Sequence, residues 1–321
     1  MAKKQIVYAS EKKAKQRNLT VRERQLYSIC AIPLIYTFIF MYIPMFGVMI
    51  AFKDYKFNLG VFGSEWVGFK NFEFFLKSDV FVQLVRNTVC NNLLFIVFGT
   101  IAAIIVALLL FEVTSRRSTK VYQTLIITPH FISWVIGAYI VYAILNIEYG
   151  YLNQILAVFG IGPIDWYSKP KVWPIILTIV SVWKMFGMDS IIYYAALMGV
   201  DSSLFEAAEV DGAGKLRKVW SITIPSLIPI IVILTIMKIG GIFRADFGLF
   251  YSVTQDGANG NLYETTNVFD TYIFRTFRSS NTGNAYGLSA AAGLFQSVVG
   301  MVLVIATNYL TKKVDKDLAL F

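Results

Sequence analysis

The chain has 321 residues, of which 56% are hydrophobic and 15% are charged, and its mean hydropathy is +0.60. Soluble domains average about 45–50% apolar and about 25% charged residues, so this composition excludes a disordered chain and argues against a water-soluble globule. With a net charge of +9, one histidine and two cysteines, the chain offers no histidine-rich metal site, no His-based catalysis and no disulfide framework. We therefore predict an all-α integral membrane protein.

Residues 1–25 form a basic tail with eight Lys and Arg and two acidic side chains. Such a tail anchors membrane topology and attracts anionic lipid weakly. A helix needs about 20 apolar residues to cross the hydrocarbon core. Six segments meet this requirement and are predicted to be transmembrane helices: 26–52, 93–111, 122–147, 172–198, 222–243 and 285–310. The second is expected to begin a turn or two before 93. They define a transmembrane domain over 26–310, which a short tail, 311–321, follows.

The basic residues are divided unequally between the two sides of these spans. The two tails and the loops 113–120 and 199–221 carry 17 Lys and Arg, whereas the longer loops on the other side carry eight. Because short loops rich in Lys and Arg remain in the cytoplasm, both termini are predicted to be cytoplasmic. Nucleic-acid binders gather basic residues on one face, so the short blocks seen here indicate topology and no nucleic-acid partner.

The loop 199–222, between the fourth and fifth spans, predicts two short helices joined by a tight corner. Ser203 and Glu206 have capping-box spacing, which starts the first helix. Gly212 and Gly214 then allow a chain reversal. Pro225 suits the first turn of the fifth span. The run Gly-Ala-Gly-Lys in this loop lacks the first glycine and the final hydroxyl of a phosphate-binding loop, so it predicts no nucleotide hydrolysis.

Three parts of this loop resemble a known family: Glu206-Ala207-Ala208, then Asp211-Gly212-Ala213, then Ile222 and Ile224-Pro225. The spacing matches, without a gap, the EAA loop of permease subunits of ABC-type, binding-protein-dependent importers. Trp220 stands where that family usually has Phe. Within the family the chain is similar to the maltose-permease group, in its branch for complex oligosaccharides. The further stretches that carry this similarity are 43–47, 52–55, 66–72, 87–88, 270–275, 287–297 and 318–321.

The resemblance implies the six-helix fold of a type I importer permease and a division of labour between subunits. A second homologous permease would complete the pathway, and an extracellular sugar-binding lipoprotein would deliver the substrate. An ABC-type ATPase dimer would dock on the loop and carry ATP and magnesium, so this chain would bind no cofactor and would not be an enzyme. The residues expected to couple it to the ATPase are Glu206, Ala207, Ala208, Asp211, Gly212, Ala213, Trp220, Ile222 and Pro225.

Ionisable groups within membrane spans suggest function, and the fourth and fifth spans contain Lys184, Asp189 and Lys238. Lys184 and Asp189 are five positions apart and do not pair easily on a helix. Residues carried over from the maltose-type permease place the substrate path at Ser181, Lys184, Met185, Met188, Lys238, Gly241 and Ile242. His130, in the third span, is expected to be a packing residue.

Two hypotheses for the lysines remain open. In one, Lys184 and Lys238 meet an anionic or heavily hydroxylated oligosaccharide, such as one that contains uronate. In the other they are structural and pair with helix ends or with acidic residues of the partner permease, or extend to a membrane edge.

Two other classes of protein also remain to be compared. A secondary transporter needs ion-coupling carboxylates at mid-membrane, for which Asp189 is the one candidate. A membrane enzyme needs a catalytic constellation, for which one histidine offers little. Neither a secondary transporter nor a membrane enzyme requires two short helices with the EAA spacing, so the sequence favours the importer permease.

Overall fold

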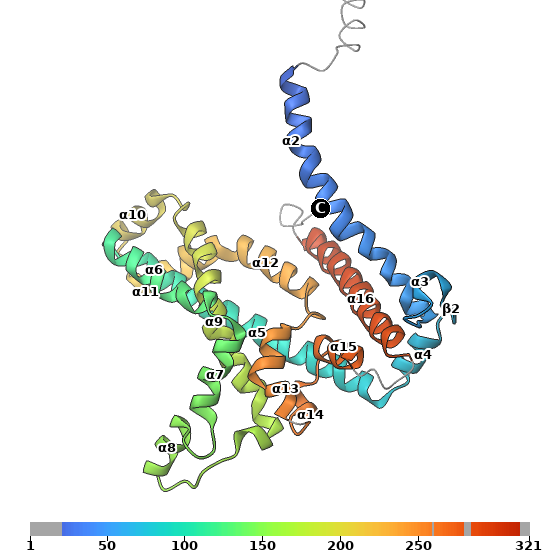
Figure 1. Ribbon diagram of the computed structural model, residues 1–321. Helices are drawn as coiled ribbons and strands as arrows, with labels where there is room; N and C mark the ends of the chain where they lie inside the picture. Colours follow the sequence, from blue (N-terminus) through green and yellow to red (C-terminus); the bar gives the residue numbers. More distant parts are fainter. Residues whose placement is uncertain (1–20, 259, 279–283, 315–321) are drawn as a thin grey trace, which may run out of the picture.

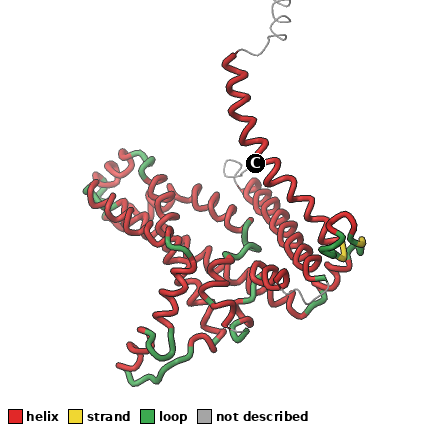
Figure 2. Tube along the Cα trace, in the orientation of Figure 1, coloured by secondary structure: helices red, strands yellow, loops and turns green. Residues whose placement is uncertain are grey.

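Figure 1 shows the computed structural model of the chain, which describes residues 21–258, 260–278 and 284–314. Residues 1–20 of the predicted basic tail and residues 315–321 of the C-terminal tail lie outside the described part. Helices dominate the described chain, and the two short strands in Figure 2 form its one sheet. These strands, β1 (Lys53–Asp54) and β2 (Glu65–Trp66), pair antiparallel in the connection after the first span.

Among the described residues, five helical stretches are long and apolar enough to cross a membrane, and a bent pair of helices would make a sixth span. The five stretches are built from α2 (Val21–Thr37), η1 (Phe38–Tyr42) and η2 (Ile43–Phe52); α5 (Asp79–Phe111); η4 (Pro170–Val172) and α9 (Trp173–Leu197); α11 (Lys215–Lys218), η5 (Val219–Thr223) and α12 (Ile224–Gly240); and α16 (Ala285–Val314). They match five of the six predicted spans in place and order.

Two of the predicted starts are wrong. The second span begins at Asp79, further ahead of 93 than the one or two turns expected, because α5 continues past its apolar run toward the N-terminus. The fifth begins at Lys215 rather than at 222, because α11, η5 and α12 form one continuous helix. Pro225 therefore lies inside this helix, directly after the π-helical turn η5, which accommodates the missing N–H of proline.

The third predicted span, 122–147, is not a single helix. It consists of α6 (Arg116–Phe131) and α7 (Trp134–Leu145), which meet at an angle of 94°. We call the two residues between them, Ile132 and Ser133, the break. The single-span prediction failed here because the apolar run continues across the break without a charge.

Local chemistry explains why the helix ends and restarts at the break. Pro129 sits in the last turn of α6, where it has no N–H to donate and clashes with the preceding turn. Ile132 then takes an extended conformation, with φ −71° and ψ 128°. Ser133 caps α7, because its Oγ accepts a hydrogen bond from the backbone N–H of Ile136 at 3.3 Å.

Short helices fill the connections at the end of the molecule opposite α10 (Figure 1). Arg86 of α5 donates to the carbonyl of Glu264 at 2.6 Å, and the Thr265 hydroxyl donates to the carbonyl of Pro170 at 2.6 Å. The connection between the fifth and sixth spans thus bridges the N-terminal part of α5 and η4, which leads into α9. The helices in these connections are α3 (Gly60–Gly63), α4 (Lys70–Leu76), α8 (Tyr151–Val158), η3 (Trp166–Ser168), η6 (Leu249–Val253), α13 (Gln255–Ala258), α14 (Tyr263–Thr266) and α15 (Phe269–Arg278).

The central helix of the fold is α9, which contributes to two apolar cores. Near its start, Trp173 and Leu177 pack with α7 and with Leu249 of η6. Near its end, Tyr193 and Leu197 pack with α5 and α12. Close van der Waals packing of these side chains fixes α9 against the broken span at one level and against the start of loop 199–222 at another.

Candidate functional site

Loop 199–222 begins with α10 (Ser202–Val210), and Asp201 is the N-cap of this helix. The Asp201 carboxylate accepts a hydrogen bond from the backbone N–H of Ser203 at 2.9 Å, and this bond holds the pKa of Asp201 below its usual value. The capping box predicted from Ser203 and Glu206 is wrong by two residues, because the extended backbone that a cap requires occurs at Asp201.

The predicted corner of the loop is confirmed at Gly212. Its φ of +73° lies in the left-handed region, which a side chain strains. The N–H of Ala213 bonds to the carbonyl of Ala208 at 2.8 Å, and the N–H of Gly212 bonds to Glu209 at 3.0 Å, which is a Schellman motif. Gly214 follows as the N-cap of α11 with an ordinary φ of −67°, a conformation that does not require glycine.

Ion pairs and a ring contact fasten the loop to its neighbours. Lys218 of α11 pairs with Glu209 of α10 at 2.6 Å, and this bond lowers the pKa of Glu209. Lys215 pairs with Glu112, just after α5, at 3.1 Å. The ring of Phe205 lies 5.6 Å from that of Phe111 at the end of α5. The loop therefore has a fixed position relative to both α5 and the fifth span.

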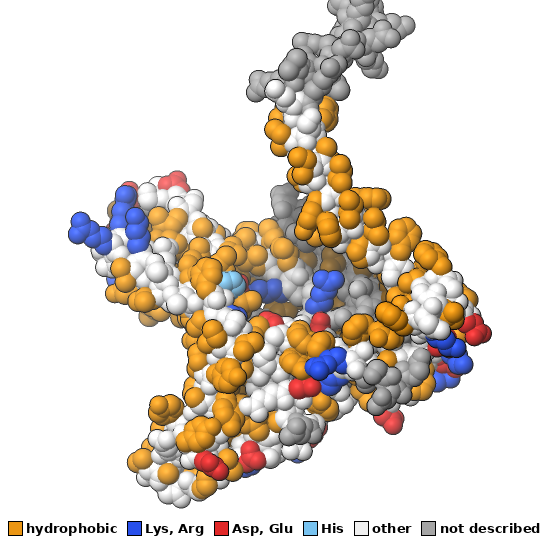
Figure 3. Space-filling model, in the orientation of Figure 1, with side chains coloured by type: hydrophobic (Ala, Val, Ile, Leu, Met, Phe, Trp, Pro, Cys, Tyr) orange, Lys and Arg blue, Asp and Glu red, His pale blue; other side chains and the backbone are white. Residues whose placement is uncertain are grey.

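The outer surface of the loop is open and largely apolar. Four large side chains are exposed, from 51% at Leu204 to 89% at Val210, with Leu216 and Trp220 between these values. Glu206 and Asp211 are also exposed, and neither carboxylate forms an ion pair within the described chain. Lys and Arg side chains gather at the same end of the molecule in Figure 3. This combination leaves an unpartnered surface with both apolar and acidic groups.

The other predicted coupling residues surround this surface. Ala207 is exposed, whereas Ala208 and Ala213 are half-buried beneath the corner. Ile222 is half-buried in η5, and Pro225 is exposed on α12. The structure thus gathers the residues from 206 to 213 at one corner and places Trp220, Ile222 and Pro225 along the helix that leaves it.

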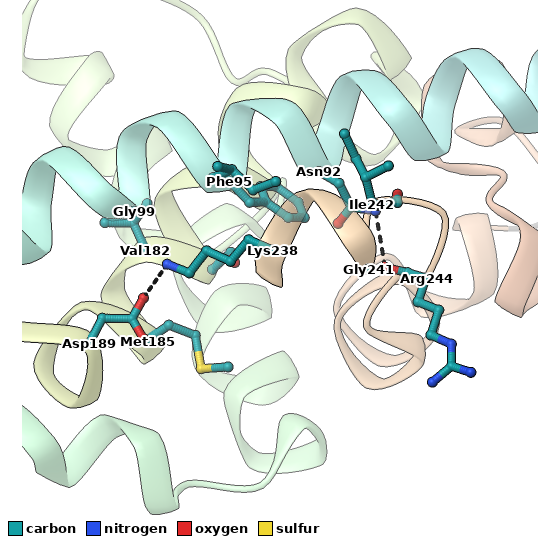
Figure 4. Close-up of a pocket in the computed structure, with 12 residues that line it drawn as sticks. Asn92, Phe95, Gly99, Val182, Met185, Asp189, Lys238, Gly241, Ile242 and Arg244 are labelled. Carbon is teal, nitrogen blue, oxygen red and sulfur yellow. Dashed lines mark hydrogen bonds and ion pairs between the residues drawn. The ribbon is translucent and has the colours of Figure 1, made fainter. Parts of the chain in front are cut away.

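A cavity of about 260 Å³ lies between α5, α9 and the end of α12 (Figure 4). Five of the seven residues predicted for the substrate path line it. These five are Ser181, Met185, Lys238, Gly241 and Ile242. The remaining lining residues are Asn92, Phe95, Ile96, Gly99, Val182, Asp189 and Arg244.

An ion pair crosses this cavity. The Lys238 ammonium of α12 lies 2.6 Å from a carboxylate oxygen of Asp189 on α9, and both side chains are about three-quarters buried. Arg244 is exposed at the edge of the cavity, and its side chain extends away from the ion pair in Figure 4. Arg244 forms no ion pair with any described carboxylate. The lining therefore carries two cationic groups and one anionic group.

Lys184 and Met188, the other two predicted path residues, do not line this cavity. Met188 of α9 is half-exposed. Lys184 is buried, and its ammonium donates to the carbonyls of His130 and Ile132 at the break. Of the two hypotheses for Lys184, the geometry agrees with the one in which it pairs with a helix end. His130 is half-buried, with Nδ1 enclosed.

The sequence did not indicate Asn92 and Arg244 as cavity residues. Asn92 of α5 holds the loop after α12 in place, because its side-chain amide donates to the carbonyls of Ile242 and Arg244 at 2.8 and 3.1 Å. This contact spans about 150 positions in the chain, so no local pattern predicts it. Arg244 could have been found as the first charge after the fifth predicted span.

Comparison with known proteins places these features in a family. Residues 96–316 match the model of the binding-protein-dependent transport system inner membrane component. Protein LplB of Bacillus subtilis is 37% identical over 296 residues, which cover 92% of this chain and 91% of LplB. The polygalacturonan/rhamnogalacturonan transport system permease protein YteP, also of B. subtilis, is 34% identical over 97% of this chain and 95% of its own length.

Solved structures give the same result. The chain superimposes on a subunit of a bacterial ABC transporter involved in the import of the acidic polysaccharide alginate, with a TM-score of 0.81 and 32% identity over 92% of this chain and 97% of the other. A second structure of the alginate transporter, in complex with its alginate pentasaccharide-bound periplasmic protein, gives a TM-score of 0.80. The chain belongs to the binding-protein-dependent transport system inner membrane component family and is a multi-pass permease subunit of an ABC importer.

Proposed function

We propose that this chain is one of two homologous permease subunits that form the pathway of an ATP-driven oligosaccharide importer. An extracellular sugar-binding lipoprotein delivers the substrate, and a dimer of ABC-type ATPase subunits carries ATP and magnesium. This chain is the non-catalytic partner, with both termini in the cytoplasm. The names of its relatives support this assignment, since they describe polysaccharide transport and a complex with a periplasmic protein.

The ATPase docks on the corner formed by α10 and α11. The observation that carries this proposal is the combination of a rigid attachment and an open outer surface. Exposed Val210 and Leu216 offer apolar area to a partner, and the free carboxylates of Glu206 and Asp211 offer charge to it. The exposed apolar side chains of the first span face membrane lipid or the second permease.

Co-purification tests this docking. The tagged chain is purified in mild detergent from its native membrane, and its partners are identified by mass spectrometry. We expect an ATPase and a second permease with the wild type, and loss of the ATPase alone with Gly212→Arg. Gly160→Arg is the matched control, since Gly160 also has a left-handed φ, of +75°, and open space around it, but lies beyond α8 at the other end. A chain that purifies alone and still transports would contradict the proposal.

The substrate is an acidic oligosaccharide, and a uronate-containing one fits best. Two cations and one carboxylate line the cavity, so an incoming carboxylate would meet a net positive charge. The ion pair with Asp189 already engages Lys238, which leaves Arg244 as the cation available to substrate. One relative belongs to a transport system for polygalacturonan/rhamnogalacturonan, and another to a transporter that imports the acidic polysaccharide alginate.

Transport kinetics test the substrate class. We expect Arg244→Gln to raise KM for an oligogalacturonate about tenfold, since a hydrogen bond to a charged group contributes about 1.5 kcal/mol or more. KM for a neutral oligosaccharide of equal length should stay unchanged. Arg117→Gln, which removes an exposed arginine at the start of α6, is the control. Equal effects of Arg244→Gln on both sugars would contradict a role in recognising charge.

A further inference from the structure

The break in the third span leaves backbone carbonyls that no helix satisfies. The last carbonyls of α6 have no following helical turn to donate to them, because the chain turns by 94° at Ile132. Within a membrane no water is available to replace those donors, so each group needs a partner in the protein. The structure supplies a side chain from another helix for this purpose.

That side chain is Lys184, on α9. Its ammonium donates to the carbonyl of His130 at 3.0 Å and to the carbonyl of Ile132, which places a positive charge at the negative end of α6. It also lies 4.9 Å from the centre of the Trp134 ring, a cation–π contact at the start of α7. No carboxylate among the described residues lies within ion-pair distance of this ammonium, and Lys184 is only 8% exposed. One buried cation thus holds both sides of the break.

Trp134 extends the connection to a third segment. Its indole N–H donates to the Asp246 carboxylate at 2.7 Å, and the other oxygen of that carboxylate accepts from the N–H of Leu249 at the start of η6. Gly248 packs directly on the ring, since a Cβ there would overlap Trp134. The loop after the fifth span is therefore joined to the break.

A second attachment lies one turn from Lys184. The backbones of α6 and α9 approach so closely at Gly187 that a Cβ there would overlap the carbonyl of Ile126. The contacts of Lys184 and Gly187 thus attach α6 to α9 at two points, which prevents α6 from rotating about α9. The same helix α9 ends at Leu197, next to loop 199–222.

We propose that Lys184 is a positioning residue that locks the break to α9, so that α6, α7, α9 and the start of η6 move as one body when the ATPase moves the loop. This inference rests on the proposed function, because it assumes that an ATPase acts on loop 199–222. Through this contact between Lys184 and the break, a movement of loop 199–222 is passed along α9 to α6 and α7. The contact does not depend on substrate, because Lys184 binds carbonyl groups of the same chain.

The test uses the whole complex, with its co-purified partners, in proteoliposomes. Lys184→Met removes the charge and keeps the length of the side chain. We expect this complex to assemble and hydrolyse ATP, but to transport at least about fivefold fewer substrate molecules per ATP. A roughly fivefold change is the lower end of the range for energetic coupling between two sites of a protein. Lys120→Met, at an exposed lysine of α6, is the control and should leave the ratio unchanged.

A distance measurement separates positioning from a merely structural role. Nitroxide labels at Leu125 of α6 and Tyr139 of α7, both exposed, report the angle of the break in a background without Cys30 and Cys90. We expect one narrow distance distribution in the wild type, with and without ATP. Lys184→Met should broaden it once ATP binds, and Lys184→Arg should restore most of the wild-type behaviour.

The outcomes discriminate between the two proposals. A narrow distribution and a wild-type transport ratio in Lys184→Met would overturn the lock but leave the importer assignment intact. A wild-type chain without any ATP-coupled transport would instead overturn the proposed function. Should Lys184→Met fail to assemble, Trp134→Phe keeps the ring and removes the bond to Asp246. A lowered ratio in that variant supports the joining of η6 to the break, and an unchanged ratio overturns this part of the proposal.

Discussion

The corner at Gly212 and the break at Ile132 and Ser133 both end a helix abruptly, but they satisfy the freed carbonyl groups differently. At the corner, the carbonyls of Ala208 and Glu209 accept N–H groups from the next few residues, and the surface stays open. At the break, a lysine from another helix donates the bonds within a buried site. Water surrounds a loop but not a membrane span. A local sequence signal is therefore enough for the corner, whereas the break depends on a long-range contact.

The largest effect should come from crowding the attachment beside the break. Gly187→Ala would push α6 away from α9, because the new Cβ overlaps a backbone carbonyl that cannot move aside. We expect a loss of about 3 kcal/mol in stability, measured as a lower Tm of the detergent-purified complex. Gly99→Ala is the control, since Gly99 also lies in a long helix and has no atom within 4 Å of a new Cβ. Equal Tm values for the two variants would contradict the close approach.

A smaller effect should come from straining the corner. Gly212→Ala places a side chain at a φ of +73°, which costs about 1 kcal/mol and should weaken ATPase binding roughly fivefold. Gly214→Ala, at an ordinary φ of −67° in the same loop, should bind the ATPase as the wild type does. Calorimetric titration of each permease complex with isolated ATPase gives both values. Equal weakening of ATPase binding by both substitutions would mean that the added side chains on the loop surface, rather than the backbone conformation at Gly212, decide docking.

The smallest effect should be a response of the corner to pH that the break lacks. The hydrogen bond and the attraction from Lys218 hold the pKa of Glu209 below its usual value. The stabilisation from this pair is therefore complete above the ordinary glutamate pKa of about 4.3, and it is lost as the pH falls through the lowered folded-state pKa. Hydrogen-exchange protection of α10 should fall in that range, and α6 should keep its protection because Lys184 binds neutral carbonyls. Lys218→Met should reduce the change to the part that Asp201, the N-cap of the same helix, contributes through its own lowered pKa. An undiminished pH response in this variant would contradict the assignment to Glu209.

The features that the sequence predicted correctly depend on neighbouring residues. The spans follow from apolar runs of membrane length, and the corner follows from Gly212 shortly after a helix-forming stretch. The EAA spacing further indicated the family, which comparison with known proteins confirms. The small errors, such as the cap at Asp201, concern competing local signals two residues apart.

The features that the sequence could not predict join distant parts of the chain. Lys184 meets Ile132 across 52 positions, and Lys238 meets Asp189 across 49. Spacing along one helix correctly argued against a pair between Lys184 and Asp189, but it could not identify the partner of either residue. Arg244 likewise reaches the cavity on a loop that Asn92 of α5 helps to hold in place.

Uptake by proteoliposomes that contain the whole complex, with ATP supplied on one side at a time, tests the coupling directly. We expect a labelled oligogalacturonate to accumulate only when ATP is on the side of the α10 corner and the loaded binding protein is on the opposite side. Gly212→Arg should abolish this uptake, and Gly160→Arg should retain ATP hydrolysis. Uptake by this chain alone, or uptake without ATP, would contradict the central claim that loop 199–222 couples an external ATPase to this permease.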